Sequence, residues 1–418
     1  MRGIRFLHAA DLHIDSPFRG LAAAPEHVVA AARSSTLEAF DGLVSLALER
    51  GVDFVVLAGD VYDAADRSLR AQLRFRDGLD RMAGAGIEVF VAHGNHDPLD
   101  SRMAALTLPE RVVVFGPEVE THEVVRDGVA IAAVSGIGYR TRVVTENLSH
   151  GFSAMRAPFH VGVLHCNLGG NTGHENYAPC TLSDLIGTGV DYWALGHVHT
   201  RAVLNATPHV VYPGNSQGRH INEPGPRGCY VVTVSEHGDV ALDFEALDRI
   251  RWHQVDVPIN DVDTVDALEV RLLGALAELS ADADGRSLIC RVRLSGRGSL
   301  HADLSRRGAS DPLLERLREA LAGADPFVWI EDLAIATRPD VDFEARRMGD
   351  DLVAEILEAP GRSPATRGAS WSRPTSRWEG CLRTASCAKA IGTPSDAELR
   401  EAVEEAALVL FDGIEGAS

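Results

Sequence analysis

Short apolar runs alternate with amphipathic stretches over the first 250 residues of the chain. Apolar, β-rich runs occupy residues 4–10, 53–58, 87–92, 129–134, 160–165 and 192–195. Helical patterns cover residues 25–50 and 67–83, between the first three of these runs. Such alternation is typical of α/β domains, in which helices cover the faces of a sheet. Later runs at 210–212, 229–234 and 240–244 follow one another without helices, which predicts antiparallel meanders.

The pattern changes near Trp252. A predicted strand is followed by a helix, a strand, a helix and a strand, at residues 253–258, 265–279, 288–294, 312–321 and 327–337. This βαβαβ order predicts a second, smaller domain. We therefore expect a first domain at residues 1–250 and the smaller one at 251–340.

The third part of the chain, residues 341–418, combines helical patterns with an irregular segment. Residues 360–394 are rich in Arg, Ser and Pro, and carry five arginines and one lysine against a single acid. Three interpretations stay open for this segment: a linker, a basic nucleic-acid contact, or a shifted reading frame. Linker or frame shift is favoured, because the spacing of Pro and Ser forbids a regular element. A final helix is expected at residues 395–411, capped by Ser395.

The composition is that of a globular protein with two or three domains, since 45% of the 418 residues are hydrophobic and 24% are charged. No apolar run reaches the roughly 18 residues of a transmembrane helix. The N-terminus lacks the apolar stretch of a signal peptide. Six scattered cysteines without a CxxC pair indicate reduced thiols and a cytoplasmic protein.

The net charge of −20 opposes strong stand-alone binding to nucleic acid, which normally needs a basic surface. A substrate that carries phosphate must therefore be attracted by local positive charge.

Ligand-type residues recur where the predicted strands end. Strands in an α/β sheet bind ligands beyond their carboxyl ends, so these residues are expected to converge. Seven of them are residue types that bind metals: Asp11, His13, Asp60, Asn95, His165, His197 and His199. A donor set of carboxylate, amide oxygen and imidazole, without thiolate, fits two divalent ions such as manganese, iron or zinc.

Two features of these residues favour a paired site. The two oxygens of a carboxylate can bridge two ions, and Asp60 is the natural candidate for that role. His197 and His199 are two positions apart, so both imidazoles of an extended chain point to the same side. His8, inside the first run, is expected to have a core or supporting role rather than a catalytic one.

At these positions the chain resembles the calcineurin-like metallophosphoesterases. The matching motifs are Asp11-Leu12-His13, Gly59-Asp60, Gly94-Asn95-His96-Asp97, His165 and Gly196-His197-Val198-His199. The stretches HAADLHIDSPFRGL and YPGNSQGRHINEPGPRG resemble the SbcD/YhaO-type DNA-repair exonucleases. The resemblance covers roughly residues 1–340. It implies a four-layer α/β/β/α sandwich with a bound pair of metal ions, usually manganese, and a smaller βαβαβ domain that caps the cleft.

The resemblance also implies which residues serve each ion. One ion would take Asp11, His13, Asp60 and His199, and the other would take Asp60, Asn95, His165 and His197. His96 would contact the scissile phosphate and protonate the leaving oxygen, a role that suits an imidazole near neutral pH. Asp97 either orients His96 or stabilises the turn.

One position departs from the family pattern. Some of these nucleases carry a histidine three positions after the bridging aspartate, where this chain has Asp63. The same stretch, with Tyr62 one position early, argues against a purple acid phosphatase.

Arginines also recur along one face of the second predicted helix. Arg67, Arg70, Arg74 and Arg81 fall on one side at helical spacing. A solvated face is the favoured interpretation, and a stripe that contacts the phosphates of DNA is the alternative.

These features favour a two-metal DNA nuclease, with exonuclease activity preferred. The expected partners are DNA and an SMC-like ATPase of the SbcC/YhaN type, and a homodimer stays open. The alternatives are a phosphatase or cyclic-nucleotide phosphodiesterase on the same site, and a mainly regulatory component of an ATPase complex.

Overall fold

The computed structural model describes residues 3–63, 68–101, 106–170 and 177–340. Its first half alternates strands and helices, as predicted. The order is β1 (Ile4–Ala9), α1 (Glu26–Arg50), β2 (Phe54–Ala58), α2 (Leu69–Gly84) and β3 (Glu88–Ala92). The three strands are almost wholly buried, which is why their sequences are continuous apolar runs rather than alternating ones.

The first six-stranded sheet has the order β12-β11-β1-β2-β3-β4. Its other members are β4 (Val112–Val114), β11 (Gly228–Val234) and β12 (Val240–Ala246). Strands β1 to β4 are parallel, whereas β11 is antiparallel to both β1 and β12. The carboxyl ends of β1, β2 and β3 therefore lie at one edge of this sheet.

The second six-stranded sheet has the order β5-β6-β7-β8-β10-β9. Its strands are β5 (Glu120–Arg126), β6 (Val129–Gly136), β7 (His160–His165), β8 (Tyr192–Gly196), β9 (Ala202–Ala206) and β10 (His209–Tyr212). The central strands β6, β7, β8 and β10 are parallel, and the edge strands are antiparallel to their neighbours.

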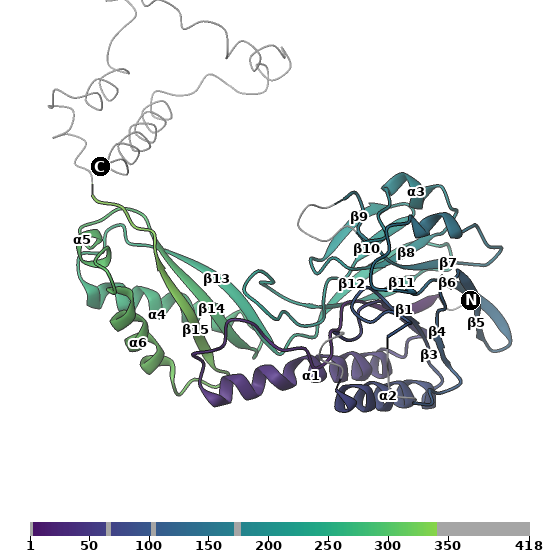
Figure 1. The fold of residues 1–418 in the computed structure, drawn as a ribbon, viewed down its shortest axis with the longest axis horizontal. Coiled ribbons are helices and arrows are strands. Elements are labelled where there is room, and N and C mark those ends of the chain that lie inside the picture. Colours follow the sequence, from purple (N-terminus) through teal and green to yellow (C-terminus); the bar gives the residue numbers. More distant parts are fainter. Residues whose placement is uncertain (1–2, 64–67, 102–105, 171–176, 341–418) are drawn as a thin grey trace, which may run out of the picture. The chain divides into compact units, whose positions relative to one another are not determined.

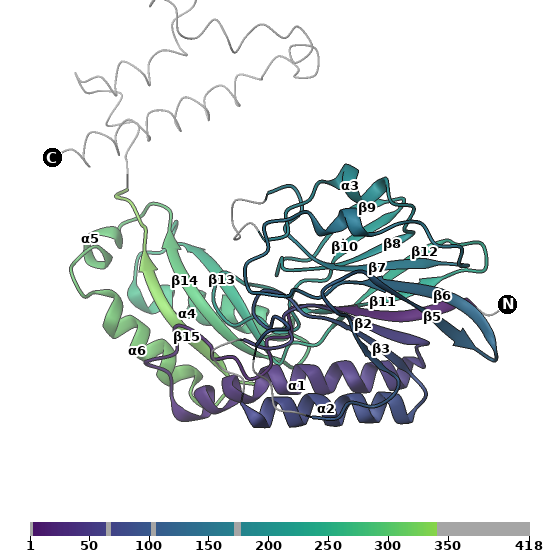
Figure 2. The same ribbon diagram turned by 45° about the vertical axis from the view of Figure 1, so that its right-hand side comes forward.

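The two sheets pack face to face, and Figure 2 shows α1 and α2 on one outer side and α3 (Leu182–Ile186) on the other. Stacked aromatic rings, among them Phe6 and Phe54, fill the space between the sheets. A second apolar cluster joins the first sheet to α1 and α2. The predicted α/β/β/α sandwich is thus confirmed, although among the described residues its fourth layer consists of α3, the short helix η1 (Leu148–Gly151) and loops.

A three-stranded parallel sheet follows, as the βαβαβ pattern predicts (Figure 1). Its strands are β13 (Ile250–Pro258), β14 (Ser287–Ser295) and β15 (Val328–Ile335), and its helices are α4 (Val265–Ala281), α5 (His301–Leu304) and α6 (Ser310–Leu321). Trp252 and Ile289 of this sheet pack against Val28 and Ala32 of α1. Among the described residues, 3–296 and 302–337 belong to one compact unit, and 297–301 and 338–340 to another. The predicted domain boundaries at residues 250 and 340 stay a prediction.

The prediction of antiparallel meanders was partly wrong. Strands β11 and β12 do form an antiparallel pair, but β10 lies in the other sheet and is parallel to β8. Strand β9, which the apolar pattern did not reveal because its side chains are largely exposed, supplies the antiparallel partner of β10. The helical and irregular segments predicted for residues 341–418 lie outside the described residues.

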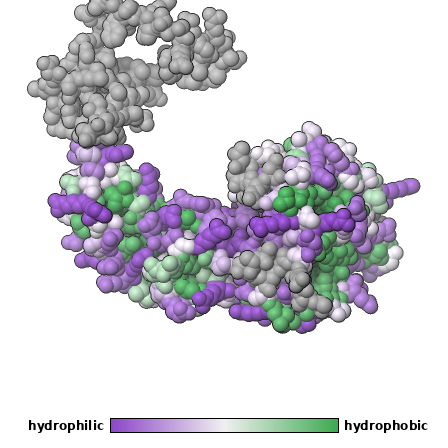
Figure 3. Space-filling model, viewed as in Figure 1, coloured by the Kyte–Doolittle hydropathy of each residue, from purple (hydrophilic) through white to green (hydrophobic). Residues whose placement is uncertain are grey.

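The surface is mixed rather than uniformly polar. The face in Figure 3 is largely hydrophilic, with hydrophobic residues in separate patches. Within the described ranges, no helix is long and apolar enough to cross a membrane.

Candidate metal centre

All seven predicted ligands come together where strands of the two sheets end. They are Asp11 and His13 after β1, Asp60 after β2, Asn95 after β3, His165 at the end of β7, and His197 and His199 after β8. Strands of both sheets therefore contribute residues to the centre.

Glycines let the converging loops approach closely. A Cβ atom on Gly94 would lie 2.3 Å from Oδ1 of Asp60, and one on Gly196 would lie 1.8 Å from the carbonyl oxygen of Ala58. No side chain fits at either position. The glycines of the two motifs are therefore required by packing.

Several of the predicted ligands have unusual backbone angles. Asp11, His13, Asp60 and His197 have φ values of 50°, 43°, 51° and 101°. Residues other than glycine rarely adopt such angles, which cost free energy and cluster at functional sites. The strain indicates that the fold holds these side chains in imposed positions.

His165 has the contacts that make it the clearest candidate ligand of this centre. Its Nδ1 atom lies 2.9 Å from the carbonyl oxygen of Ala58, so this nitrogen carries a proton and donates it. Its Nε2 atom lies 3.0 Å from Oδ1 of Asn95 and 3.3 Å from Oδ2 of Asp60. In a neutral imidazole, Nε2 would present a lone pair to two acceptors. A proton or a metal ion must therefore lie on that side of the ring.

The electrostatics agree with this arrangement. Burial opposes charge on His165, but the Asp60 carboxylate outweighs burial and raises the pKa of the imidazole to about 9. Burial also opposes charge on Asp60, yet the same histidine holds the pKa of that carboxyl well below its usual range. For Asp11, burial is the dominant effect and raises the pKa to about 6.

His13 and His199 form a second group near Asp60. Their Nε2 atoms are 3.2 Å apart, so only one proton fits between them. Nδ1 of His199 donates to Oε1 of Glu223 at 2.6 Å, which leaves Nε2 of His199 as a lone pair facing the centre. Asp60 links the two groups, because its Oδ2 is 3.3 Å from Nε2 of His165 and 4.0 Å from Nε2 of His13.

The ligand atoms form groups of the size that an ion requires. The donor atoms of Asp11, His13 and His199 all lie within 4.8 Å of one another, and so do those of Asp11, Asp60 and His165. His197 completes the set, since its Nδ1 atom lies 3.3 Å from Oδ1 of Asn95. These donors, which include facing lone pairs and buried carboxylates, fit a pair of divalent ions.

His96 lies at the edge of this centre and contacts Asp63. Its backbone amide donates to Oδ1 of Asp60 at 2.9 Å, and its Nδ1 atom donates to Oδ1 of Asp63. The His96 side chain is 36% exposed, whereas that of His165 is fully buried. His96 is therefore within reach of a substrate that approaches from solvent.

Asp97 has the turn-stabilising arrangement rather than the orienting one. Its carboxylate accepts hydrogen bonds from the backbone amides of Gly94 and Val61, both at 2.8 Å. It thereby ties the loop after β3 to the loop after β2. The His96 ring contacts Asp63 through its Nδ1 atom.

The predicted arginine stripe belongs to α2. Arg74 donates through Nε to Oδ1 of Asp41 on α1 at 3.0 Å, and also pairs with the second oxygen of that carboxylate. Arg70 lines the same α1–α2 surface, and Arg67 lies outside the described residues. The charge of Arg74 is thus partly neutralised, which favours a solvated, ion-paired face.

Sequence reasoning missed two residues that support the centre. Glu223, which holds His199, and Arg219, which donates to Oδ2 of Asp63 at 2.8 Å, both lie in the long loop after β10. They follow no strand directly and are not among the predicted metal ligands. Both lie inside the stretch YPGNSQGRHINEPGPRG that carries the family resemblance, and this was the one signal that could have suggested them.

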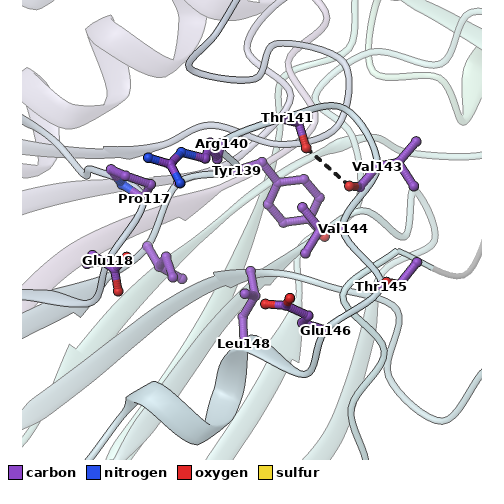
Figure 4. A pocket seen from close by; sticks show the side chains of 12 residues that line it. Pro117, Glu118, Tyr139, Arg140, Thr141, Val143, Val144, Thr145, Glu146 and Leu148 are labelled. Carbon is purple, nitrogen blue, oxygen red and sulfur yellow. Dashed lines mark hydrogen bonds between the residues drawn. The ribbon is translucent and has the colours of Figure 1, made fainter.

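A pocket of about 290 Å³ lies near the centre but contains none of the predicted ligands (Figure 4). Glu118, Arg140 and Thr141 are among its lining residues. Tyr139 also lines it and donates its hydroxyl proton to the carbonyl oxygen of His165 at 2.7 Å. The pocket is therefore separate from the ligand cluster, with Tyr139 between them.

Two family models match the chain. The model described as calcineurin-like phosphoesterase matches residues 4–201, and the model described as the middle domain of metallophosphoesterase YhaO matches residues 252–338. The first match contains all seven predicted ligands, and the second covers the three-stranded sheet.

Three curated relatives illustrate the range of similarity. The chain is 38% identical over 329 residues to the uncharacterized metallophosphoesterase YhaO of Bacillus subtilis, covering 78% of this chain and 80% of the relative. It is 26% identical to SbcD, a component of the SbcCD nuclease of Escherichia coli K12, over 56% of this chain and 65% of the relative. It is also 26% identical to the DNA double-strand break repair protein Mre11 of Thermoplasma acidophilum, over 51% of this chain and 60% of the relative.

Proposed function

The chain belongs to the calcineurin-like metallophosphoesterase family, whose members hydrolyse phosphoester bonds, and from this premise we propose that it is a two-metal DNA nuclease. Exonuclease activity is the form that we favour. The observation that carries the proposal is the convergence of seven ligand-type residues from five strands of two sheets, with Nε2 of His165 facing two oxygen acceptors.

In this proposal one ion is held by Asp11, His13, Asp60 and His199, and the other by Asp60, Asn95, His165 and His197. Bound divalent ions would neutralise phosphate charge and make a water molecule nucleophilic at neutral pH. Mn²⁺ is the favoured metal, and Fe²⁺ and Zn²⁺ have the same donor preferences among imidazole and carboxylate ligands.

The chain's own residues act on the leaving group. His96 is exposed enough to reach a substrate, and Asp63 holds the proton on its Nδ1 atom. We assign to His96 the donation of a proton from Nε2 to the oxygen that leaves the phosphorus. Asp63 is then a positioning residue, because it fixes the ring and stabilises its charged form.

DNA as substrate is supported by the similarity to two proteins, one named as part of a nuclease and the other as a DNA repair protein. The net charge of −20 limits the affinity of the isolated chain for DNA. We therefore propose that an SMC-like ATPase of the SbcC/YhaN type supplies additional DNA contacts. Four described cysteines are free and buried, which agrees with a reducing, cytoplasmic location.

The test compares substrates on the purified full chain loaded with Mn²⁺. Linear duplex DNA, closed circular duplex DNA, a chromogenic phosphodiester, a cyclic nucleotide and a phosphomonoester are supplied separately, with Asp60→Asn as the inactive control. We expect degradation of linear DNA and of the diester, and little hydrolysis of the monoester. Preferred hydrolysis of the monoester or of a cyclic nucleotide would replace the nuclease by a phosphatase or phosphodiesterase. A metal-loaded chain that cleaves none of them would support a regulatory role in an ATPase complex.

A further inference from the structure

Arg219 is fixed beside the candidate centre by three different segments. Its amide donates to Oε2 of Glu223 at 2.7 Å, and its carbonyl oxygen accepts from the amide of Arg19 at 3.1 Å. Its Nη1 atom donates to Oδ2 of Asp63 at 2.8 Å. Only 13% of the side chain is exposed. The guanidinium is therefore held in one place and does not move freely in solvent.

Asp63 uses only part of the hydrogen-bonding capacity of this guanidinium. An arginine side chain has five N–H donors. Nε of Arg219 is buried and has no hydrogen-bond partner among the residues that the structure describes. An unpaired buried donor on a charged group costs free energy. Phosphate oxyanions, like carboxylates, are ligands that a guanidinium binds through parallel N–H donors.

The position of Arg219 relative to His96 indicates which phosphate it would bind. His96 contacts Oδ1 of Asp63, and Arg219 contacts Oδ2 of the same carboxylate. The two oxygens of one carboxylate are close neighbours, so the imidazole and the guanidinium lie side by side. A single phosphodiester at His96 would therefore have Arg219 within reach.

The positive charge of Arg219 can offset negative charge in the candidate metal centre. Four buried or half-buried carboxylates belong to this centre: Asp11, Asp60, Asp63 and Glu223. A phosphodiester brings a further negative charge, and the chain as a whole is acidic. We propose that Arg219 binds a non-bridging oxygen of the substrate phosphodiester beside His96, an inference that rests on the proposed function of the centre.

Arg219→Gln tests this inference, with Arg316→Gln as the matched control. Arg316 also pairs with a single carboxylate, that of Glu269, but it lies on helix α6 beside the three-stranded sheet and not in the candidate metal centre. For each Mn²⁺-loaded variant, bound metal is measured by elemental analysis and the Kd of inorganic phosphate by isothermal titration. Kinetics on a chromogenic phosphodiester give KM and kcat. For Arg219→Gln we expect about a tenfold to hundredfold weaker phosphate Kd and a matching rise in KM, with metal content unchanged.

The same measurements can also overturn the inference. If Arg219 only neutralises Asp63, the variant will lose kcat and shift its pH profile while the phosphate Kd stays at the wild-type value, which overturns the inference. Should Arg219→Gln fail to fold, Arg219→Lys keeps the charge but loses the parallel donors. We expect at least a threefold weaker Kd for it, and an unchanged Kd overturns the inference. A wild-type chain that binds phosphate but cleaves no diester would contradict the proposed function alone.

Discussion

Oδ1 of Asp63 accepts a hydrogen bond from Nδ1 of His96. Burial disfavours a charged imidazole, but this contact and the charge of Asp60 outweigh burial and raise the pKa of His96 above its ordinary value. Asp63 is itself held in place, because Ser16 donates to its Oδ2 at 2.9 Å. The position that departs from the expected family pattern thus holds a carboxylate that serves the neighbouring imidazole.

Asp63→Asn should therefore impair proton donation without removing the metals. We expect kcat on a phosphodiester to fall by about 10²-fold, which is the lower end of general acid catalysis. Activity that needs the charged imidazole is lost as the pH rises through its pKa. Because the variant lowers that pKa, the loss should occur at lower pH than in the wild type. Asp303→Asn, on α5 and paired with Arg306, is the control. An unchanged pH profile would contradict the role of Asp63.

Glu223 should control metal affinity through His199. Partners that hold the second nitrogen of a ligating histidine typically contribute 10- to 100-fold to metal affinity. We expect Glu223→Ala to weaken binding of one Mn²⁺ by about that factor, and Glu223→Gln to weaken it less because its amide oxygen still accepts a hydrogen bond. Titration calorimetry on the metal-free protein measures both. Glu269→Gln, on α4, should leave both affinities unchanged, and equal affinities in all variants would exclude this role.

Metal removal should destabilise the whole chain. Asp11 and Asp60 are each only 1% exposed and lie in the same cluster of ligand atoms, and burial raises the pKa of Asp11 to about 6, so without cations the charge of Asp11 is poorly compensated. Ions that bind only the folded state stabilise it by about 3 kcal/mol at a hundredfold excess over Kd. We expect a chelator to lower the Tm by several degrees and two equivalents of Mn²⁺ to restore it. Asp60→Asn should respond to neither, and a Tm insensitive to both in the wild type would count against the centre.

The candidate ligands could be predicted from the sequence because each of them lies at the end of an apolar run or within a few residues after it. In a parallel arrangement, such positions converge at the ends of the strands regardless of the loops between them. Glu223 and Arg219 gave no such signal. Their partners His199 and Asp63 lie 24 and 156 residues away, and only the folded loop after β10 brings them into contact. The prediction placed strand β10 in an antiparallel meander for a similar reason. A short buried run does not specify which sheet it joins.

His8 predicts a pH dependence of stability that is separate from catalysis. It is fully buried, with Nε2 donating to the carbonyl oxygen of Leu195 at 3.2 Å and Nδ1 2.9 Å from the hydroxyl of Tyr192. Burial lowers the pKa of His8 to about 3, while an unfolded histidine has a pKa near 6.5.

The unfolded state therefore binds an additional proton between pH 6.5 and 3. The stability that depends on neutral His8 is complete above pH 6.5 and decreases as the pH falls, by about 1.4 kcal/mol per pH unit for this group. We expect His8→Gln to be less stable than wild type at pH 7 but to lose less free energy of unfolding between pH 6.5 and 4.5. Urea denaturation at several pH values measures this, and parallel curves for the two proteins would contradict it.

Replacing Gly78 on α2 by alanine should lower the free energy of unfolding through overpacking, whereas helix propensity alone predicts an increase. A Cβ atom at this position would lie 2.4 Å from a ring carbon of Phe40 and 3.0 Å from Val44, both fully buried on α1. Alanine normally stabilises a helix relative to glycine by about 1 kcal/mol. Overpacking of a rigid core costs about 1–3 kcal/mol, and the Phe40 ring cannot move into solvent. We therefore expect Gly78→Ala to lower the free energy of unfolding. Gly84→Ala lies at the end of the same helix, where the added Cβ would meet no described residue within 4 Å apart from its chain neighbours and its own helical turn, so it should be neutral or slightly stabilising. Urea midpoints at unchanged m-value compare the two, and a stabilised Gly78→Ala would show that α1 and α2 leave room for a methyl group between them.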